Sequence, residues 1–297
     1  MLRRLLCVFL TILLSVMLLA CSSTEPERRP APAPAPAASD SRHPYGNPAV
    51  GALPWESQTE FIERQAALGA VNRLAGFETK LPDPLPGEEE NVRLAARLLA
   101  GRTVEPGQTF SLVQIIGPFN RTRGYQKGPV YVGSEVRTGT GGGVCKIATT
   151  LYNVVILSNL PIVERRNHGM LVPYVPAGQD ATINSEHPDL RFRNDRKEPL
   201  LIWSSTVGTT LYIAIYGAEK APIVSWGHQV SDVKVFPTVY RTNAALPSGS
   251  ERTIVPGAEG MTVKSWVDIV YADSRREKRE LGTDQYRPMP RVIERAK

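Results

Sequence analysis

Apolar residues in the central part of the chain recur at spacings that predict two helices. Between 88 and 100 they lie three or four positions apart, glutamates fill the first turn, and Gly101 follows. Acidic residues favour a helix N-terminus and glycine commonly ends a helix, so a helix is predicted over 88–100. The same spacing predicts a second helix over 147–157.

Shorter runs of alternating or β-branched residues predict strands around these helices. The clearest pair is 200–207 and 210–216, which Gly208 and Thr209 would join as a hairpin. The other predicted strands span 69–81, 109–116, 128–136, 162–165, 181–184, 190–193, 233–240, 251–255, 261–271 and 274–281. This pattern predicts an α+β fold, with a mixed, mainly antiparallel β-sheet domain and a few helices over 69–217. A small all-β module over 218–285 and a basic tail over 286–297 would follow.

The N-terminal segment has the pattern of an exported protein. Arg3 and Arg4 precede an apolar run that ends in Leu-Leu-Ala-Cys, which resembles a lipobox. We therefore expect a lipoprotein signal peptide over 1–20, with lipid on Cys21 anchoring the chain to a bacterial membrane on its extracytoplasmic side. An ordinary signal peptide or an uncleaved anchor is the alternative. Residues 21–68 begin with a stretch rich in proline and alanine, which predicts an extended spacer.

The overall composition indicates little about function, whereas the positions of the cysteines indicate more. A hydrophobic content of 42% is ordinary for a globular protein, and the net charge of +6 accompanies no nucleic-acid motif. We expect no nucleic-acid partner, whereas an anionic wall or lipid is compatible with this charge. Of the three cysteines, Cys7 lies in the segment to be removed and Cys21 at the removal site. Cys145 is left without a disulfide partner, which favours a chemical role.

The residues around Cys145 fit an activated thiol. Three glycines before it allow positive φ and close approach to a ligand, and the first N–H groups of the helix can bind an oxyanion. The helix dipole and the neighbouring cation favour a thiolate, so we expect the pKa of Cys145 to lie below its free value. Cys145 is therefore the candidate nucleophile. The candidate oxyanion or substrate loop consists of Gly141, Gly142, Gly143, Val144, Lys146 and Thr149.

His168, 23 residues after Cys145, is the candidate general base. A helix that climbs ~18 Å and an extended return of ~20 Å would bring His168 back beside Cys145, if the two run antiparallel. A general base of this kind needs a polar group that orients its ring. The sequence offers four such orienters and does not choose among them: Asp180, Asn167, Glu164 and Tyr174.

Non-catalytic roles remain open at this point. Cys145 could pack as a small buried apolar residue, and Thr149 could cap and pack the helix. A metal bound by Cys145 and His168 is a weaker alternative, because the chain has no CxxC or HxxxH pattern; we expect no metal and no cofactor. The other three histidines are expected in loops as solvated or hydrogen-bonded residues: His43, His187 and His228.

Several motifs, in order, resemble the VanW-like family of bacterial surface proteins, named for a gene in some vancomycin-resistance clusters. They cover about residues 72–217 and lie at 90–96, 106–111, 117–118, 123–125, 141–145, 150–153, 164–168 and 174–182. Two positions depart from the family pattern, which usually has Gln at Lys146 and Ser at Gly169. The segment 246–281 resembles a five-glycine (G-five) β module, which is thought to help attach proteins to cell-wall glycans.

The resemblance implies work on peptidoglycan, and for some members an L,D-transpeptidase activity that uses the family cysteine. On this basis we expect a lipid-anchored transpeptidase that acts through an acyl-enzyme, with peptidoglycan stem peptides or glycan as partners. The alternatives are a cysteine peptidase that trims wall peptides and a non-catalytic protein that binds peptidoglycan or a glycopeptide. The sequence does not indicate the oligomeric state.

Overall fold

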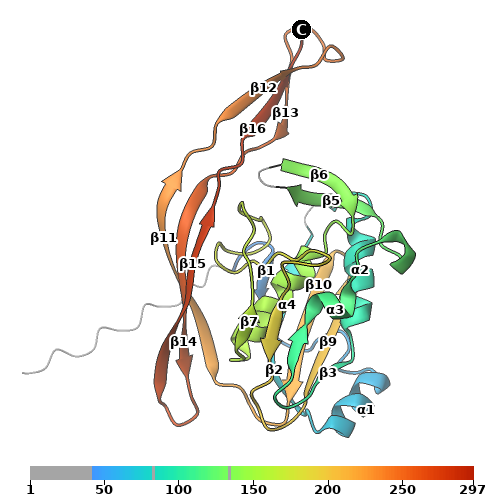
Figure 1. Cartoon of the computed structure of the whole chain (residues 1–297), viewed down its shortest axis with the longest axis vertical. Coiled ribbons are helices and arrows are strands. Elements are labelled where there is room, and N and C mark those ends of the chain that lie inside the picture. Colours follow the sequence, from blue (N-terminus) through green and yellow to red (C-terminus); the bar gives the residue numbers. More distant parts are fainter. Residues whose placement is uncertain (1–41, 82–83, 133–134) are drawn as a thin grey trace, which may run out of the picture. The chain divides into compact units, whose positions relative to one another are not determined.

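A computed structural model describes residues 42–81, 84–132 and 135–297 (Figure 1). The predicted signal peptide, Cys21 and the proline-rich stretch lie outside the described residues. The expected α+β fold is confirmed, because the sheets are almost entirely antiparallel and are accompanied by four α-helices in the described part. In that part, no helix has both the length and the apolar character needed to span a membrane.

A five-stranded antiparallel sheet forms the centre of the main domain. Its strands, in spatial order, are β1 (Gly46–Pro48), β2 (Asn72–Lys80), β10 (Thr210–Gly217), β9 (Leu200–Val207) and β3 (Arg102–Val104). The predicted hairpin is confirmed as β9 and β10, with Thr210 opposite Val207. Because side chains alternate between the faces of a strand, the central strands β9 and β10 supply apolar side chains to both faces of the sheet.

Helices cover the sheet on both faces. Leu200 and Ile202 of β9 point toward helices α2 (Glu88–Leu99) and α4 (Cys145–Leu157) in the larger core. Leu201 and Trp203, the alternating positions, belong to a second core with Trp55 and with Phe61 of helix α1 (Thr59–Leu68). Both predicted helices are therefore confirmed, and they pack on the same face of the sheet.

Helix α4 is held firmly because it is buried almost all round. Every residue from Lys146 to Ile156 is buried, and Thr150 hydrogen-bonds Thr79 of β2 at 2.8 Å inside the core. A helix with so little exposed surface gains most of its stability from packing. Its first residue, Cys145, is thereby placed at a defined point of the domain.

Smaller elements complete the described part of the chain. A three-stranded sheet has the order β4 (Thr109–Ser111), β8 (Arg191–Arg193) and β7 (Ile162–Glu164), and β5 (Lys127–Val132) pairs with β6 (Glu135–Thr140). The C-terminal module has two three-stranded sheets. One contains β11 (Ile223–Lys234), β14 (Gly260–Val270) and β15 (Arg276–Tyr286), and the other β12 (Thr238–Thr242), β16 (Arg291–Arg295) and β13 (Glu251–Val255).

Several predicted boundaries need correction. The strand predicted over 109–116 ends at Ser111, whose hydroxyl caps the short helix α3 (Leu112–Ile116) by accepting from the Gln114 N–H at 3.2 Å. The strand predicted over 128–136 is a hairpin, 181–184 is not a strand, and 233–240 is split between β11 and β12. The predicted basic tail is also structured, since β16 pairs with both β12 and β13.

The spacer predicted over 21–68 also needs correction for its described residues. Strand β1 pairs with β2, and the Trp55 side chain is fully buried, with its Nε1 donating to the Tyr216 hydroxyl at 2.9 Å. The buried residues Trp55 and Phe61 are separated by polar residues, so the sequence shows no regular apolar pattern in this segment. Residues from at least 46 onward are therefore part of the folded domain.

Replacing Trp55 with alanine should lower the free energy of unfolding by about 3 to 5 kcal/mol, because it removes a fully buried indole from the second core. Urea denaturation measures this change. Val50→Ala is the matched control in the same segment, since Val50 is 67% exposed, and it should change stability by less than about 0.5 kcal/mol. Equal, small effects of both substitutions would mean that this segment does not pack on the sheet.

Candidate functional site

The loop before Cys145 requires glycine for steric reasons. Gly141 and Gly143 have φ values of +82° and +97°, which side-chain-bearing residues rarely adopt. Gly142 lies so close to strand β5 that an added Cβ would come 2.2 Å from the Gly128 carbonyl carbon. The Asn91 side chain of α2 then fixes the loop, donating to the Gly142 carbonyl at 2.9 Å. The glycines therefore serve loop geometry and close backbone packing.

Cys145 begins helix α4 and is a partly exposed residue. The Sγ atom lies 3.4 Å from the Thr182 hydroxyl and 3.5 Å from the Ile183 carbonyl oxygen. It lines a cavity of about 360 Å³ together with the glycine loop, Lys146 and His168. The thiol is therefore accessible from a cavity of a size suited to a small substrate group.

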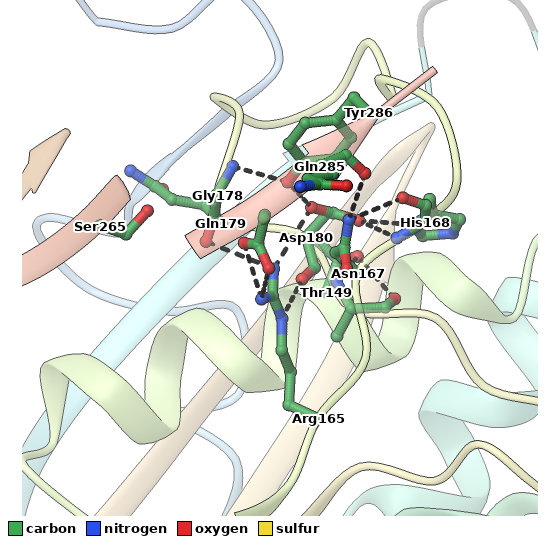
Figure 2. Close-up of polar contacts among 12 residues, drawn as sticks. Thr149, Arg165, Asn167, His168, Gly178, Gln179, Asp180, Ser265, Gln285 and Tyr286 are labelled. Carbon is green, nitrogen blue, oxygen red and sulfur yellow. Dashed lines mark hydrogen bonds and ion pairs between the residues drawn. The ribbon is translucent and has the colours of Figure 1, made fainter. Parts of the chain in front are cut away.

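His168 and Asp180 form a buried pair beside this cavity (Figure 2). The ring Nδ1 lies 2.6 Å from Asp180 Oδ2, and the backbone N–H of His168 donates to the same oxygen at 2.7 Å. His168 is 4% exposed and Asp180 is 1% exposed. With Nδ1 held by Asp180, Nε2 is the ring nitrogen that remains to interact with Cys145. The structure thus brings together Cys145, His168 and one of the four candidate orienters.

The charges of these three groups reinforce one another. Burial raises the pKa of the Cys145 thiol, but hydrogen bonding and charge from His168 outweigh it, so the net pKa is lowered. Burial lowers the pKa of His168, but Asp180 and the thiol raise it to about 9. The pKa of Asp180 is lowered, because His168 and Arg165 outweigh its burial. At neutral pH the favoured state is therefore a thiolate beside an imidazolium beside a carboxylate.

Lys146 adds a buried cation to the wall of the same cavity. Its Nζ lies 3.8 Å from Glu88 Oε1 and 4.8 Å from the centroid of the Tyr174 ring. Burial lowers the pKa of Lys146 to about 8, although Glu88 raises it. The ammonium group is thus mostly charged at neutral pH, and it gives the cavity a positive side.

Three backbone N–H groups around the thiol remain candidate oxyanion donors. The N–H groups of Val144, Lys146 and Ile147 donate to backbone carbonyls of the same turn. Those of Gly142, Gly143 and Cys145 have no backbone acceptor among the described residues. The candidate donors of the expected oxyanion site are therefore these three groups.

The other predicted site residues lie farther from the chemistry. Asn167 donates through Nδ2 to the backbone carbonyls of His168 and Gln285, at 2.9 and 3.1 Å, and not to the imidazole ring. Glu164 accepts from the Asp189 N–H at 2.9 Å. Thr149 exchanges hydrogen bonds with the backbone of Ala181, so it secures the segment after Asp180 and does not line the cavity.

The sequence does not indicate several contacts around Asp180. Tyr286 of β15 donates to Asp180 Oδ1 at 2.5 Å (Figure 2). One guanidinium nitrogen of Arg165 donates to both carboxylate oxygens of Asp284, at 2.6 and 2.7 Å. These partners are more than one hundred residues apart, and no local pattern marks them. His228 was expected in a loop, but it lies in β11 and contacts Gln179 and Ser265.

The three groups at the site are of the kinds that nucleophilic acyl transfer uses. An ionised thiol, a proton-carrying imidazole and an orienting carboxylate are the parts that such a reaction requires. The described residues contain no cluster of three or more His, Cys, Asp or Glu side chains suited to a metal ion.

Known proteins are similar to this chain over the same region. A family model described as VanW like protein matches residues 87–216. The chain is 35% identical over 150 residues to the uncharacterized protein YoaR of Bacillus subtilis, covering 50% of each chain. It is 32% identical over 139 residues to the vancomycin B-type resistance protein VanW of Enterococcus faecalis, covering 44% of this chain and 50% of that protein. The chain thus spans about half the length of these curated relatives.

Two solved structures are similar to a smaller part of the chain. The G5 domain of an IgA1 protease is 18% identical, with a TM-score of 0.17, and covers 27% of this chain and 98% of that one. HP0197-G5 is 16% identical, with a TM-score of 0.15, and covers 24% of this chain and 96% of that one. Scores this low carry no conclusion about what the C-terminal module binds.

The match to the family model includes the whole candidate site in the main domain. Cys145, His168 and Asp180 all fall within residues 87–216, whereas Tyr286 and Asp284 lie beyond them. The region that carries the thiol, the imidazole and the carboxylate is therefore the region that matches the VanW-like family model.

Proposed function

We propose that this chain is a cell-wall-associated protein whose main domain is a cysteine acyltransferase of the L,D-transpeptidase type, anchored through lipid on Cys21. One observation carries the proposal: the Cys145 thiol and the His168 imidazole line one cavity, and the buried carboxylate of Asp180 holds that imidazole through Nδ1. A cysteine that only packs needs neither a histidine beside it nor a buried anion behind that histidine.

The first half of the reaction uses the thiolate and the imidazolium. The Cys145 sulfur attacks the carbonyl carbon of a stem-peptide bond, forming a C–S bond and placing negative charge on the carbonyl oxygen. The N–H groups of Gly142, Gly143 and Cys145, which have no backbone acceptor in the described part of the chain, would stabilise that charge. As the C–N bond breaks, His168 gives its proton to the leaving amine, and a D-alanine leaves the thioester behind.

The second half reverses these roles. An amine of a neighbouring stem attacks the thioester, His168 takes its proton, and the thiolate leaves as the new amide forms. Water in place of the amine would instead make the protein a peptidase that trims wall peptides. Stem peptides carry carboxylates, and the buried ammonium of Lys146 offers this cavity a partner for one of them.

Cys145→Ala should abolish the acyl adduct on the full chain incubated with wall tetrapeptides, because no atom remains to form the thioester. His168→Ala should slow adduct formation by about 10² to 10⁴-fold, the usual contribution of a positioned acid and base. Intact-protein mass spectrometry measures both.

His187→Ala is the matched control, since the His187 side chain is 84% exposed and lies away from the cavity. It should form the adduct at the wild-type rate. An adduct in Cys145→Ala would contradict the proposal. Saturable binding of wall peptides by the wild type with no adduct would support the non-catalytic alternative instead. Product masses separate joined stems from trimmed stems.

The thiol should react with iodoacetamide well below the pH expected for free cysteine, about 8.5. The thiol pKa is lowered chiefly by His168 against the opposing effect of burial, so the thiolate persists as pH falls until that lowered pKa is crossed. His168→Ala removes the lowering interaction, and the midpoint of the rate should move upward. A wild-type midpoint at or above 8.5 would mean that the thiol is not activated.

A further inference from the structure

The end of strand β15 in the C-terminal module contacts the residues on both sides of the candidate base. The Asn167 side chain donates to the Gln285 carbonyl at 3.1 Å, and the N–H of Arg287, the residue after β15, donates to the Gly169 carbonyl at 2.8 Å. Between these contacts, His168 binds Asp180, which accepts from Tyr286 of β15. The segment that carries the imidazole is therefore attached to the end of β15 on both sides of His168.

The two oxygens of Asp180 have different sources of hydrogen bonds. Among the described residues, Oδ2 contacts His168 alone, at its ring Nδ1 and at its backbone N–H. Oδ1 receives the Tyr286 hydroxyl at 2.5 Å and, at a longer 3.4 Å, the Arg165 guanidinium. A carboxylate taken out of water needs donors on both oxygens. The short contact on Oδ1 comes from the C-terminal module.

The Tyr286 hydroxyl is fixed in a donating role toward Asp180. It accepts from the Gly178 N–H at 2.8 Å, so its own hydrogen is directed to the carboxylate (Figure 2). Burial and the neighbouring carboxylates raise the pKa of Tyr286, which keeps the hydroxyl protonated. The side chain is buried, and its ring alone could fill the same space without the oxygen.

Arg165 ties the same segment to β15 by a second route. One guanidinium nitrogen donates to both oxygens of Asp284 at 2.6 and 2.7 Å, and Nε donates to the Asp180 carbonyl at 2.7 Å. The charge of Asp284 balances that of Arg165. Without Asp284, the Arg165 guanidinium would have Asp180 as its carboxylate partner, and it would compete with His168 for that carboxylate.

From these contacts we infer that Tyr286 is a positioning residue of the acyltransferase site and that β15 of the C-terminal module completes the arrangement Cys145, His168 and Asp180. The inference rests on the proposed function for its catalytic meaning. Its physical content is narrower: the Tyr286 hydroxyl holds Asp180 so that Oδ2 faces the imidazole, and Asp284 keeps Arg165 from drawing that carboxylate away.

Tyr286→Phe in the full chain tests this role, because phenylalanine keeps the buried ring and removes only the donor. The midpoint of iodoacetamide alkylation of Cys145 should rise by about one pH unit, which makes alkylation below the midpoint roughly tenfold slower. The reason is that a carboxylate with one oxygen poorly satisfied holds the imidazolium less well, and the imidazolium then stabilises the thiolate less.

Tyr271→Phe is the matched control in the same module, since the Tyr271 hydroxyl donates to Glu277 at 2.6 Å and takes no part in the Asp180 contacts. It should leave the profile unchanged. A Tyr286→Phe profile that superimposes on the wild type, with an unchanged melting temperature, would overturn the inference.

Asp284→Asn covers the case in which Tyr286→Phe does not fold. It keeps the shape of the side chain and removes the charge that balances Arg165, so the alkylation midpoint should again rise, with Asp268→Asn on β14 as control. An unchanged midpoint in a folded Asp284→Asn variant would also count against the inference. Alkylation needs no wall peptide, so this test is independent of the proposed reaction. If the variants shift the alkylation midpoint but the wild type never forms an acyl adduct, the proposed function is wrong and this inference still holds.

Discussion

The candidate site depends on one buried carboxylate. Asp180 is almost fully enclosed, and an ionised carboxyl group in such a place is stable only when donors surround it. Those donors come from the turn that carries His168, from Arg165 after β7, and from Tyr286 of β15. Because Oδ2 of this carboxylate accepts from both the ring and the backbone N–H of His168, the imidazole is held in one orientation, with Nε2 as the ring nitrogen that can serve the thiol.

A second constraint sets the position of the sulfur. Helix α4 is buried along its length, so its first residue cannot shift without disturbing the core. The glycine loop before it packs against the backbone of β5, and the Asn91 side chain bridges the loop to the residue before that strand. The position of the thiol is thus fixed by the buried helix and by the glycine loop. The Cys145 side chain lines the cavity.

The two constraints together explain the charge state of the site. A thiol this enclosed would ordinarily keep its proton, since burial disfavours the ion. Here an imidazolium stabilised by Asp180 compensates, so the sulfur and the ring favour the ionised pair. Lys146 contributes a further positive charge, which it retains at neutral pH despite burial. The cavity is therefore lined by a thiolate and by the positive charges of His168 and Lys146.

Local signals in the sequence predicted helices α2 and α4, the β9 to β10 hairpin, the glycine loop and the pair Cys145 and His168, because periodicity, turn chemistry and chain reach act over a few to a few tens of residues. They missed α1 and α3. Tertiary structure alone decided that Asp180 orients the ring, that Trp55 belongs to the core and that Tyr286 reaches the carboxylate. These contacts join segments that are distant in the chain. Their partners are chosen by burial and hydrogen-bond satisfaction in three dimensions, which no local pattern of residues records.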